Sequence, residues 1–119
     1  MKRILLVEDS SLFYRFIRDV LKKDDVEIVW AKSGKEALEK FKKNTPNLVI
    51  VDIILSDMNG VELIRKLKEI NKEAKVIVIT GLDKDYVAED AFEAGAEDYI
   101  VKNIPIKEFR DKIIHYLQD

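Results

Sequence analysis

The chain has 119 residues, of which 47% are hydrophobic and 37% charged, so we expect one domain over residues 1–119 with enough apolar side chains for a core. Its 21 basic and 23 acidic residues give a net charge of −2, which argues against direct binding to nucleic acid or to a membrane surface. Cysteine is absent, which excludes disulfides and thiolate metal sites, and no N-terminal apolar stretch is long enough for a signal peptide or a membrane span, so we expect a cytoplasmic protein.

Five short apolar runs alternate along the chain with five amphipathic stretches. The runs, which we predict to be strands, cover residues 3–7, 26–30, 48–51, 76–79 and 99–101. The amphipathic stretches, which we predict to be helices, begin near Ser10 or Ser11, at Ser33, at Asn59, at about Asp85 and at about Ile106. This alternation is typical of an α/β fold, here a doubly wound five-stranded parallel sheet with helices on both faces.

Start and stop signals accompany several of these helices. Ser33 with Glu36, and Asn59 with Glu62, have the spacing of a capping box, and Gly95 marks the end of the fourth helix. The apolar positions at helical spacing are Leu12, Phe13, Phe16, Ile17, Val20 and Leu21 in the first helix, Ala37, Leu38 and Phe41 in the second, and Val61, Ile64, Leu67 and Ile70 in the third. We expect these positions to face the core.

Polar side chains of different chemistry stand where four of the apolar runs stop. Glu8 and Asp9 follow the first run, Asp52 the third, Thr80 the fourth and Lys102 the fifth. Ligands of open α/β sheets bind beyond the carboxyl ends of parallel strands. The sequence therefore predicts a site at one rim of the sheet.

The chemistry of these side chains suggests what the site does. Carboxylates about 4 Å apart repel by roughly 4 kcal/mol per pair, so a crowded group of three must hold protons or bind a hard cation. Oxygen ligands favour Mg²⁺. With that charge in place, and with Lys102 and Thr80 beside it, one carboxylate could carry a phosphoryl group covalently. Asp52, on the central strand, is the strongest candidate for the nucleophile.

The chain resembles the receiver domains of two-component response regulators (the CheY-like superfamily), especially the stand-alone, single-domain type. The resemblance extends from Lys2 to about Leu117 and rests on five motifs in the right order and spacing: Leu5-Leu6-Val7-Glu8-Asp9-Ser10, Pro46-Asn47-Leu48-Val49-Ile50-Val51-Asp52, Met58-Asn59-Gly60, Val78-Ile79-Thr80-Gly81, and Ala94-Gly95-Ala96-Glu97-Asp98-Tyr99-Ile100-Val101-Lys102. It implies a (βα)5 flavodoxin-like fold with strand order 2-1-3-4-5, an order that is taken from the family.

The resemblance also implies a role for each rim residue. Asp52 would accept a phosphoryl group from a histidine kinase or a phosphotransfer protein. Asp9, Asp52 and the backbone carbonyl of Ile54 would ligate Mg²⁺, with Glu8 holding the metal through water. Lys102 would contact the phosphoryl group.

A switch is implied as well. Thr80 would turn inward to bond a phosphoryl oxygen, and Tyr99 would move into the space that Thr80 leaves. The face built from the fourth helix, the fifth strand and the fifth helix would then change shape for a downstream protein whose identity the sequence does not give. Dimers in this family pair a basic residue of the fourth helix with an acidic one of the fifth strand; Asp98 fits the latter, but Asp90 stands near the former position, so we expect a monomer.

The sequence departs from the family at the loop after the last strand. The lysine is usually followed by a proline with a cis peptide bond, whereas here Asn103 follows Lys102 and the proline is Pro105. A cis bond before asparagine would cost about 2.5–4 kcal/mol, so the sequence leaves the conformation of this loop open.

Other functions are less consistent with the sequence. A pseudo-receiver, a protein-interaction module that takes no phosphate, normally lacks the acceptor, the acidic pair or the lysine, and all are present here. A haloacid-dehalogenase-type phosphatase needs a second acid two residues after its nucleophile, where this chain has Ile54. A flavodoxin-like or nucleotide-binding protein needs a phosphate loop after the first strand, where Glu8 and Asp9 would repel phosphate. We therefore expect a phosphoacceptor switch whose only catalysis is its own phosphorylation and dephosphorylation.

Overall fold

Five parallel strands form the centre of the computed structural model, which describes residues 1–118. The strands are β1 (Lys2–Val7), β2 (Val26–Ala31), β3 (Leu48–Val51), β4 (Val76–Thr80) and β5 (Asp98–Val101), in the spatial order β2-β1-β3-β4-β5. The helices are α1 (Ser11–Val20), α2 (Gly34–Lys43), α3 (Gly60–Ile70), α4 (Asp85–Ala94) and α5 (Ile106–Leu117). The predicted doubly wound α/β fold and the strand order implied by the family are confirmed.

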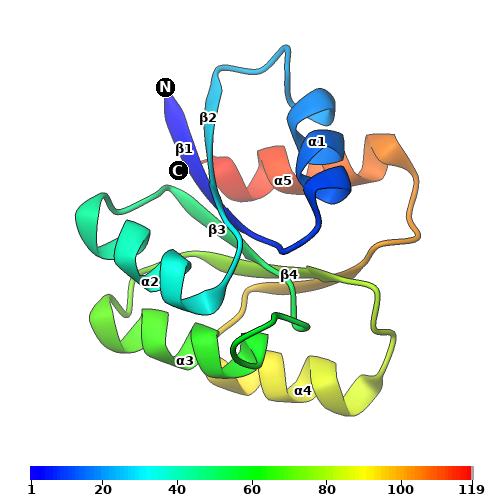
Figure 1. The fold of residues 1–119 in the computed structure, drawn as a ribbon. Coiled ribbons are helices and arrows are strands. Elements are labelled where there is room, and N and C mark those ends of the chain that lie inside the picture. Colours follow the sequence, from blue (N-terminus) through cyan, green and yellow to red (C-terminus); the bar gives the residue numbers. More distant parts are fainter. Residues whose placement is uncertain (119) are drawn as a thin grey trace.

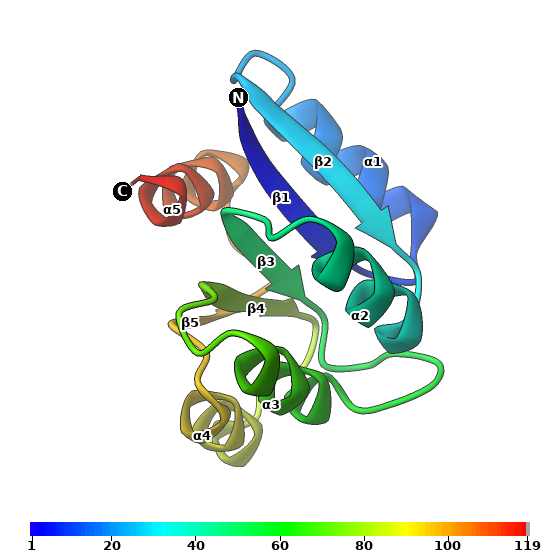
Figure 2. The same cartoon turned by 90° about the vertical axis from the view of Figure 1, so that its left-hand side faces the viewer.

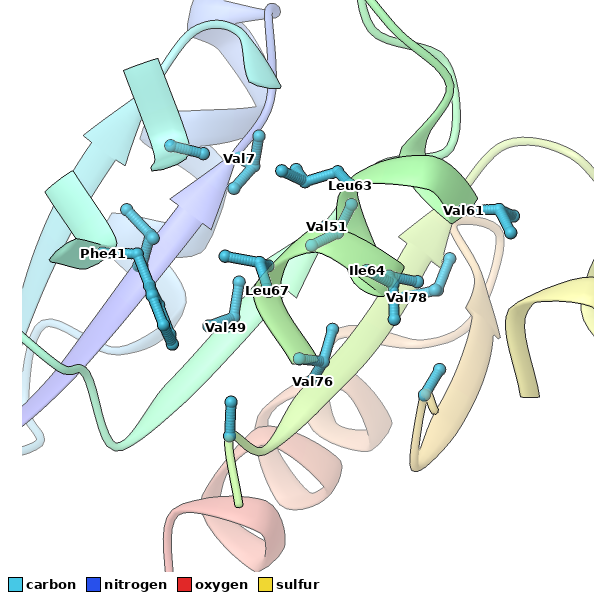
Figure 3. Packing of buried hydrophobic residues seen from close by; sticks show 14 of the residues in the cluster. Val7, Phe41, Val49, Val51, Val61, Leu63, Ile64, Leu67, Val76 and Val78 are labelled. Carbon is cyan, nitrogen blue, oxygen red and sulfur yellow. The ribbon is translucent and has the colours of Figure 1, made fainter. Parts of the chain in front are cut away.

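Helices cover both faces of the sheet (Figures 1 and 2). Helices α1 and α5 lie on one face, and α2, α3 and α4 lie on the other. Each face has its own apolar cluster, because successive side chains of a strand point to opposite faces. Figure 3 shows the second of these clusters, in which side chains of α2 and α3 meet valines of the strands; its labelled members are Val7, Phe41, Val49, Val51, Val61, Leu63, Ile64, Leu67, Val76 and Val78.

The helix boundaries follow from local capping. The side chain of Ser33 accepts a hydrogen bond from the backbone of Glu36, and that of Asn59 accepts one from Val61, so the helices begin where the sequence predicts. The Glu36 carboxylate accepts a hydrogen bond from the backbone N–H of Lys32, one residue before the Ser33 cap. Gly95 ends α4 with a φ of 117°, a left-handed conformation that favours glycine.

Two predicted core positions were wrong. Leu12 is 75% exposed and Ile70 is 44% exposed. They lie in the first turn of α1 and at the last residue of α3. Helical periodicity identifies one face of a helix but not how far along the helix that face is buried. Within residues 1–118, no helix has both the length and the apolar character needed to cross a membrane.

Candidate functional site

The polar side chains of the predicted rim lie at one edge of the sheet. Parallel pairing aligns the ends of neighbouring strands, Val7 with Val51 and Thr80 with Val101. Glu8, Asp52 and Lys102 each follow the last residue of their strand, and Thr80 is the last residue of β4. Between β3 and β4, Val51 is level with Val78, so Thr80 lies two residues farther along. Strands that end near the same edge therefore bring residues far apart in sequence to one place.

Lys102 joins the two buried carboxylates of this edge. Its ammonium donates hydrogen bonds to Glu8 Oε2 at 2.8 Å and to Asp52 Oδ2 at 3.2 Å. The other oxygens accept from the backbone: Glu8 Oε1 from Ser10 and Asp52 Oδ1 from Ile54, both at 3.2 Å. Glu8 is only 1% exposed and Asp52 6%. The result is a compact group of two anions and one cation.

The electrostatics of this group are not fully balanced. Burial raises the pKa of Glu8 from 4.5 to about 7, and the charge of Asp52 adds to this, while the hydrogen bond from Lys102 opposes it. For Lys102, burial acts to lower the pKa, but the hydrogen bond to Glu8 and the charge of Asp52 outweigh it and raise the pKa above its ordinary value. Lys102 therefore stays charged, and it compensates the burial of Glu8 only in part.

The donor atoms at this edge fit a hard cation. Mg²⁺ usually binds one or two protein carboxylates and keeps several waters, so oxygen ligands such as those of Glu8 and Asp52 suit it. Asp9 is exposed, and within residues 1–118 its carboxylate makes no hydrogen bond or ion pair. Across the same described residues, no three His, Cys, Asp or Glu side chains form a ready-made metal-binding group. The structure thus brings two of the three predicted carboxylates together, and Asp9 stands beside them.

The loop between β3 and α3 is fixed by contacts that sequence reasoning missed. The Asp57 carboxylate accepts hydrogen bonds from the backbone N–H groups of Gly34 and Lys35, both at 2.9 Å, and these bonds lower its pKa. At Gly60, the first residue of α3, a Cβ would overlap the carbonyl oxygen of Asp52. Because Asp57 is exposed and follows no strand, its sequence context gave no signal for this cap.

Thr80 and Tyr99 both contact Leu82, which lies between them in sequence. Thr80 is fully buried, and its Oγ1 accepts a hydrogen bond from the backbone of Leu82 at 3.4 Å. The Tyr99 hydroxyl donates to the carbonyl oxygen of Leu82 at 2.6 Å. Burial, with added effects of Asp83 and Asp52, raises the pKa of Tyr99, so the hydroxyl remains a donor. One loop residue therefore links the two predicted switch positions.

The loop after Lys102 contains no cis bond. Every peptide bond within residues 1–118 is trans, including the one between Lys102 and Asn103. Pro105 then precedes the first residue of α5. The departure from the family pattern at Asn103 is thus accommodated by an ordinary trans backbone.

Two aromatic side chains support the site from the α1 side. The indole N–H of Trp30 donates to the carbonyl oxygen of Glu8 at 2.7 Å, and its ring stacks on Tyr14 with 4.4 Å between centroids. The Lys102 ammonium lies 4.2 Å from the ring centroid of Phe13. An aromatic residue on an apolar helix face or at a strand end gives the same sequence signal whether it fills the core or supports a site, so these roles were missed.

Comparison with known proteins agrees with this geometry. A family model described as the response regulator receiver domain matches residues 4–114. The chemotaxis protein CheY of Bacillus subtilis is 37% identical over 101 residues, which are 84% of each chain. The CheY-like receiver domain protein from Methanospirillum hungatei has a TM-score of 0.91 at 31% identity, covering 98% of this chain and 94% of its own. The BeF3-activated N-terminal receiver domain of Klebsiella pneumoniae RstA has a TM-score of 0.92 at 30% identity, covering 99% and 100%. The chain belongs to the family of response regulator receiver domains.

Proposed function

We propose that this protein accepts a phosphoryl group on Asp52 from a histidine kinase or a phosphotransfer protein, in a reaction that depends on Mg²⁺. The observation that carries the proposal is the position of Asp52: its carboxylate is buried at the carboxyl edge of the central strand, 3.2 Å from the ammonium of Lys102 and joined through it to Glu8. A buried nucleophile beside a fixed cation is suited to phosphoryl transfer.

In this reaction the Asp52 carboxylate attacks the phosphorus of a phosphohistidine, the N–P bond breaks, and the imidazole leaves. Lys102 is already beside the acceptor and would neutralise a phosphoryl oxygen without a large movement. Glu8 through water, Asp9, Asp52 and the backbone carbonyl of Ile54 would hold Mg²⁺. When bound, the metal would supply positive charge to the acidic pair and to the incoming phosphoryl group.

The contacts of Leu82 suggest how phosphorylation reaches the α4-β5-α5 face. When Thr80 turns to bond a phosphoryl oxygen, its hydroxyl leaves the backbone N–H of Leu82. The carbonyl of the same residue holds the Tyr99 hydroxyl. A change at Thr80 would therefore release or shift Tyr99, which lies on β5, and so alter the surface offered to a downstream protein.

The other functions fit the site less well. A pseudo-receiver would have no need of an acceptor, an acidic partner and a lysine within hydrogen-bond distance of one another. A phosphatase of the dehalogenase type lacks its acid, because Ile54 offers only its backbone. We therefore propose a signalling switch with no catalysis beyond its own phosphorylation and dephosphorylation.

The proposed partners are a phosphoryl donor and an unidentified downstream protein, with the protein acting as a monomer in the cytoplasm and without direct nucleic-acid binding. Asp98, the acidic residue of β5 that could pair across a dimer, instead accepts a hydrogen bond from Tyr116 of the same chain at 2.9 Å. Size-exclusion chromatography with light scattering, before and after phosphorylation, would test the monomer.

Intact mass spectrometry tests the proposed function. After incubation with acetyl phosphate and Mg²⁺, the wild-type protein should gain one phosphoryl group, and it should gain none with EDTA. Asp52→Asn should gain none, whereas Asp57→Asn, which changes an aspartate of the same loop that only caps α2, should be modified like wild type. Undiminished modification of Asp52→Asn would rule out this acceptor, and an unmodified wild type under both acetyl phosphate and a phosphorylated kinase would favour the pseudo-receiver.

A further inference from the structure

The ammonium of Lys102 has a third partner besides the two carboxylates. It lies 4.2 Å from the ring centroid of Phe13, in the first turn of α1. A cation at this distance from an aromatic face is attracted by the ring quadrupole, and the attraction increases where water is excluded. Here the side chain of Lys102 is only 27% exposed. The ammonium therefore has an aromatic ring as well as two anions as its neighbours.

The Phe13 ring is itself fixed in place. Its centroid lies 5.7 Å from that of Phe16 and 6.3 Å from that of Phe109, the latter in an edge-to-face arrangement. Phe109 is 1% exposed and belongs to the apolar cluster between the sheet and α1 and α5. Phe16 completes the group, 5.6 Å from Phe109. The surface under the ammonium is thus a rigid extension of the core, and it does not depend on the conformation of a loop.

We propose that Phe13 is a positioning residue for phosphoryl transfer: its ring face holds the Lys102 ammonium over the Asp52 carboxylate, where the phosphoryl oxygens arrive. The inference rests on the proposed function, in which Asp52 is the acceptor and Lys102 contacts the phosphoryl group. Phe13 would touch neither the phosphoryl group nor the metal, and it would act only through Lys102.

The physical reason lies in the flexibility of lysine. A lysine side chain has a flexible four-carbon stem with about 2 kcal/mol of rotamer entropy, so its ammonium can point in many directions. Without the ring, the ammonium keeps its attraction to the two carboxylates but gains access to water on the side that Phe13 now covers. With a metal bound to the carboxylates, before the phosphoryl group arrives, the anions would hold Lys102 less strongly, whereas the ring would hold it as before. Pre-organisation of this kind lowers the barrier of a reaction that depends on placed charge.

The alternative role for Phe13 is packing alone, and the chain offers a matched control. Phe16 belongs to the same three-ring cluster, is partly buried like Phe13, and has no described contact with Lys102. If Phe13 only packs, Phe13→Leu and Phe16→Leu should have similar effects. If its ring holds the ammonium, Phe13→Leu should differ from Phe16→Leu, and Phe13→Tyr, which keeps an aromatic face, should behave like wild type.

The first measurement is a spectroscopic test of the geometry. In NMR spectra of the metal-free protein, protons next to the Lys102 ammonium should be shifted upfield by the ring current of Phe13, and these signals are identified by their absence in Lys102→Ala. The upfield shift should persist in Phe16→Leu and Phe13→Tyr and disappear in Phe13→Leu. A wild-type spectrum without the shift, or a shift that survives in Phe13→Leu, would overturn the inference.

The second measurement is the rate of acyl phosphate formation with acetyl phosphate and Mg²⁺. Loss of one cation–π contact at a partly exposed site should slow Phe13→Leu about three- to tenfold, while Phe13→Tyr and Phe16→Leu stay near wild type. Equal rates for Phe13→Leu and Phe16→Leu, with the wild type still phosphorylated, would overturn the positioning role and leave the proposed function standing. A wild type that forms no acyl phosphate would overturn both.

Discussion

Replacing Glu8 with glutamine should remove a pH-dependent loss of stability from the metal-free protein. Burial, together with the charge of Asp52, raises the pKa of Glu8 from 4.5 to about 7 in the folded protein. Between these pH values the folded protein holds a proton that the unfolded chain releases, so the free energy of unfolding decreases as the pH rises. The favourable contribution of this group is complete below pH 4.5 and is lost as the pH passes through 7.

The magnitude follows from the two pKa values. Their difference, 7 minus 4.5, corresponds to about 3 kcal/mol. Because Glu8 is 1% exposed, solvent screening does little to reduce this figure. Glutamine has nearly the shape of the protonated glutamate and, like it, keeps one carbonyl oxygen that can accept the hydrogen bond from Lys102. We therefore expect Glu8→Gln to match wild type near pH 4 and to exceed it by up to about 3 kcal/mol at pH 8.

Urea unfolding in EDTA across this pH range is the assay. Glu36→Gln is a control of opposite sign: the hydrogen bond from Lys40 lowers the pKa of Glu36, so this carboxylate contributes stability above its unfolded pKa that is lost as the pH falls. Glu36→Gln should therefore be less stable than wild type at neutral pH. A difference between Glu8→Gln and wild type that is the same at every pH would refute the reasoning.

Three further substitutions test the packing around the acceptor. Lys102→Ala should reduce the stability of the metal-free protein by about 3 kcal/mol, because it leaves two buried carboxylates without their cation. In thermal melts, added Mg²⁺ should restore the lost stability, and equal melting of variant and wild type without metal would contradict this. Gly60→Ala should lower the free energy of unfolding by at least about 2 kcal/mol and abolish phosphorylation, because the new Cβ overlaps the Asp52 carbonyl. A variant as stable as wild type in urea titrations would show that the loop moves freely. Trp30→Phe keeps a ring that can stack on Tyr14 but loses the hydrogen bond to the Glu8 carbonyl, so it should lower the free energy of unfolding by about 1 kcal/mol. An unchanged urea midpoint would show that this hydrogen bond makes no net contribution to stability.

Much of the fold was predictable because its cause is local and repetitive. Buried parallel strands read as uninterrupted apolar runs, and helices read as amphipathic stretches with their own caps, so the elements and their order could be taken from the sequence. The errors came at helix ends. Leu12 and Ile70 have the right periodicity, yet they lie near helix ends and are exposed, because periodicity carries no information on where along a helix the buried contacts stop.

The site was predictable to the extent that it depends on strand ends. Placing Glu8, Asp52, Thr80 and Lys102 at one rim needs only that the carboxyl ends of parallel strands lie at the same edge of the sheet. The contacts within the rim were not predictable, because they depend on side-chain directions. That Lys102 bridges Glu8 and Asp52, which are 94 and 50 residues away in sequence, and that Phe13 lies beneath its ammonium, follows from packing between distant segments.

The most direct test of the central claim is to locate the phosphoryl group. Borohydride reduces an acyl phosphate of aspartate to homoserine, which peptide mass spectrometry can place in the chain. After phosphorylation with Mg²⁺ and reduction, homoserine should appear at position 52 and nowhere else. Reduction at Glu8 or Asp9, the other carboxylates of the same edge, or no reduced residue in a protein that has gained a phosphoryl group, would contradict the assignment of Asp52 as the acceptor.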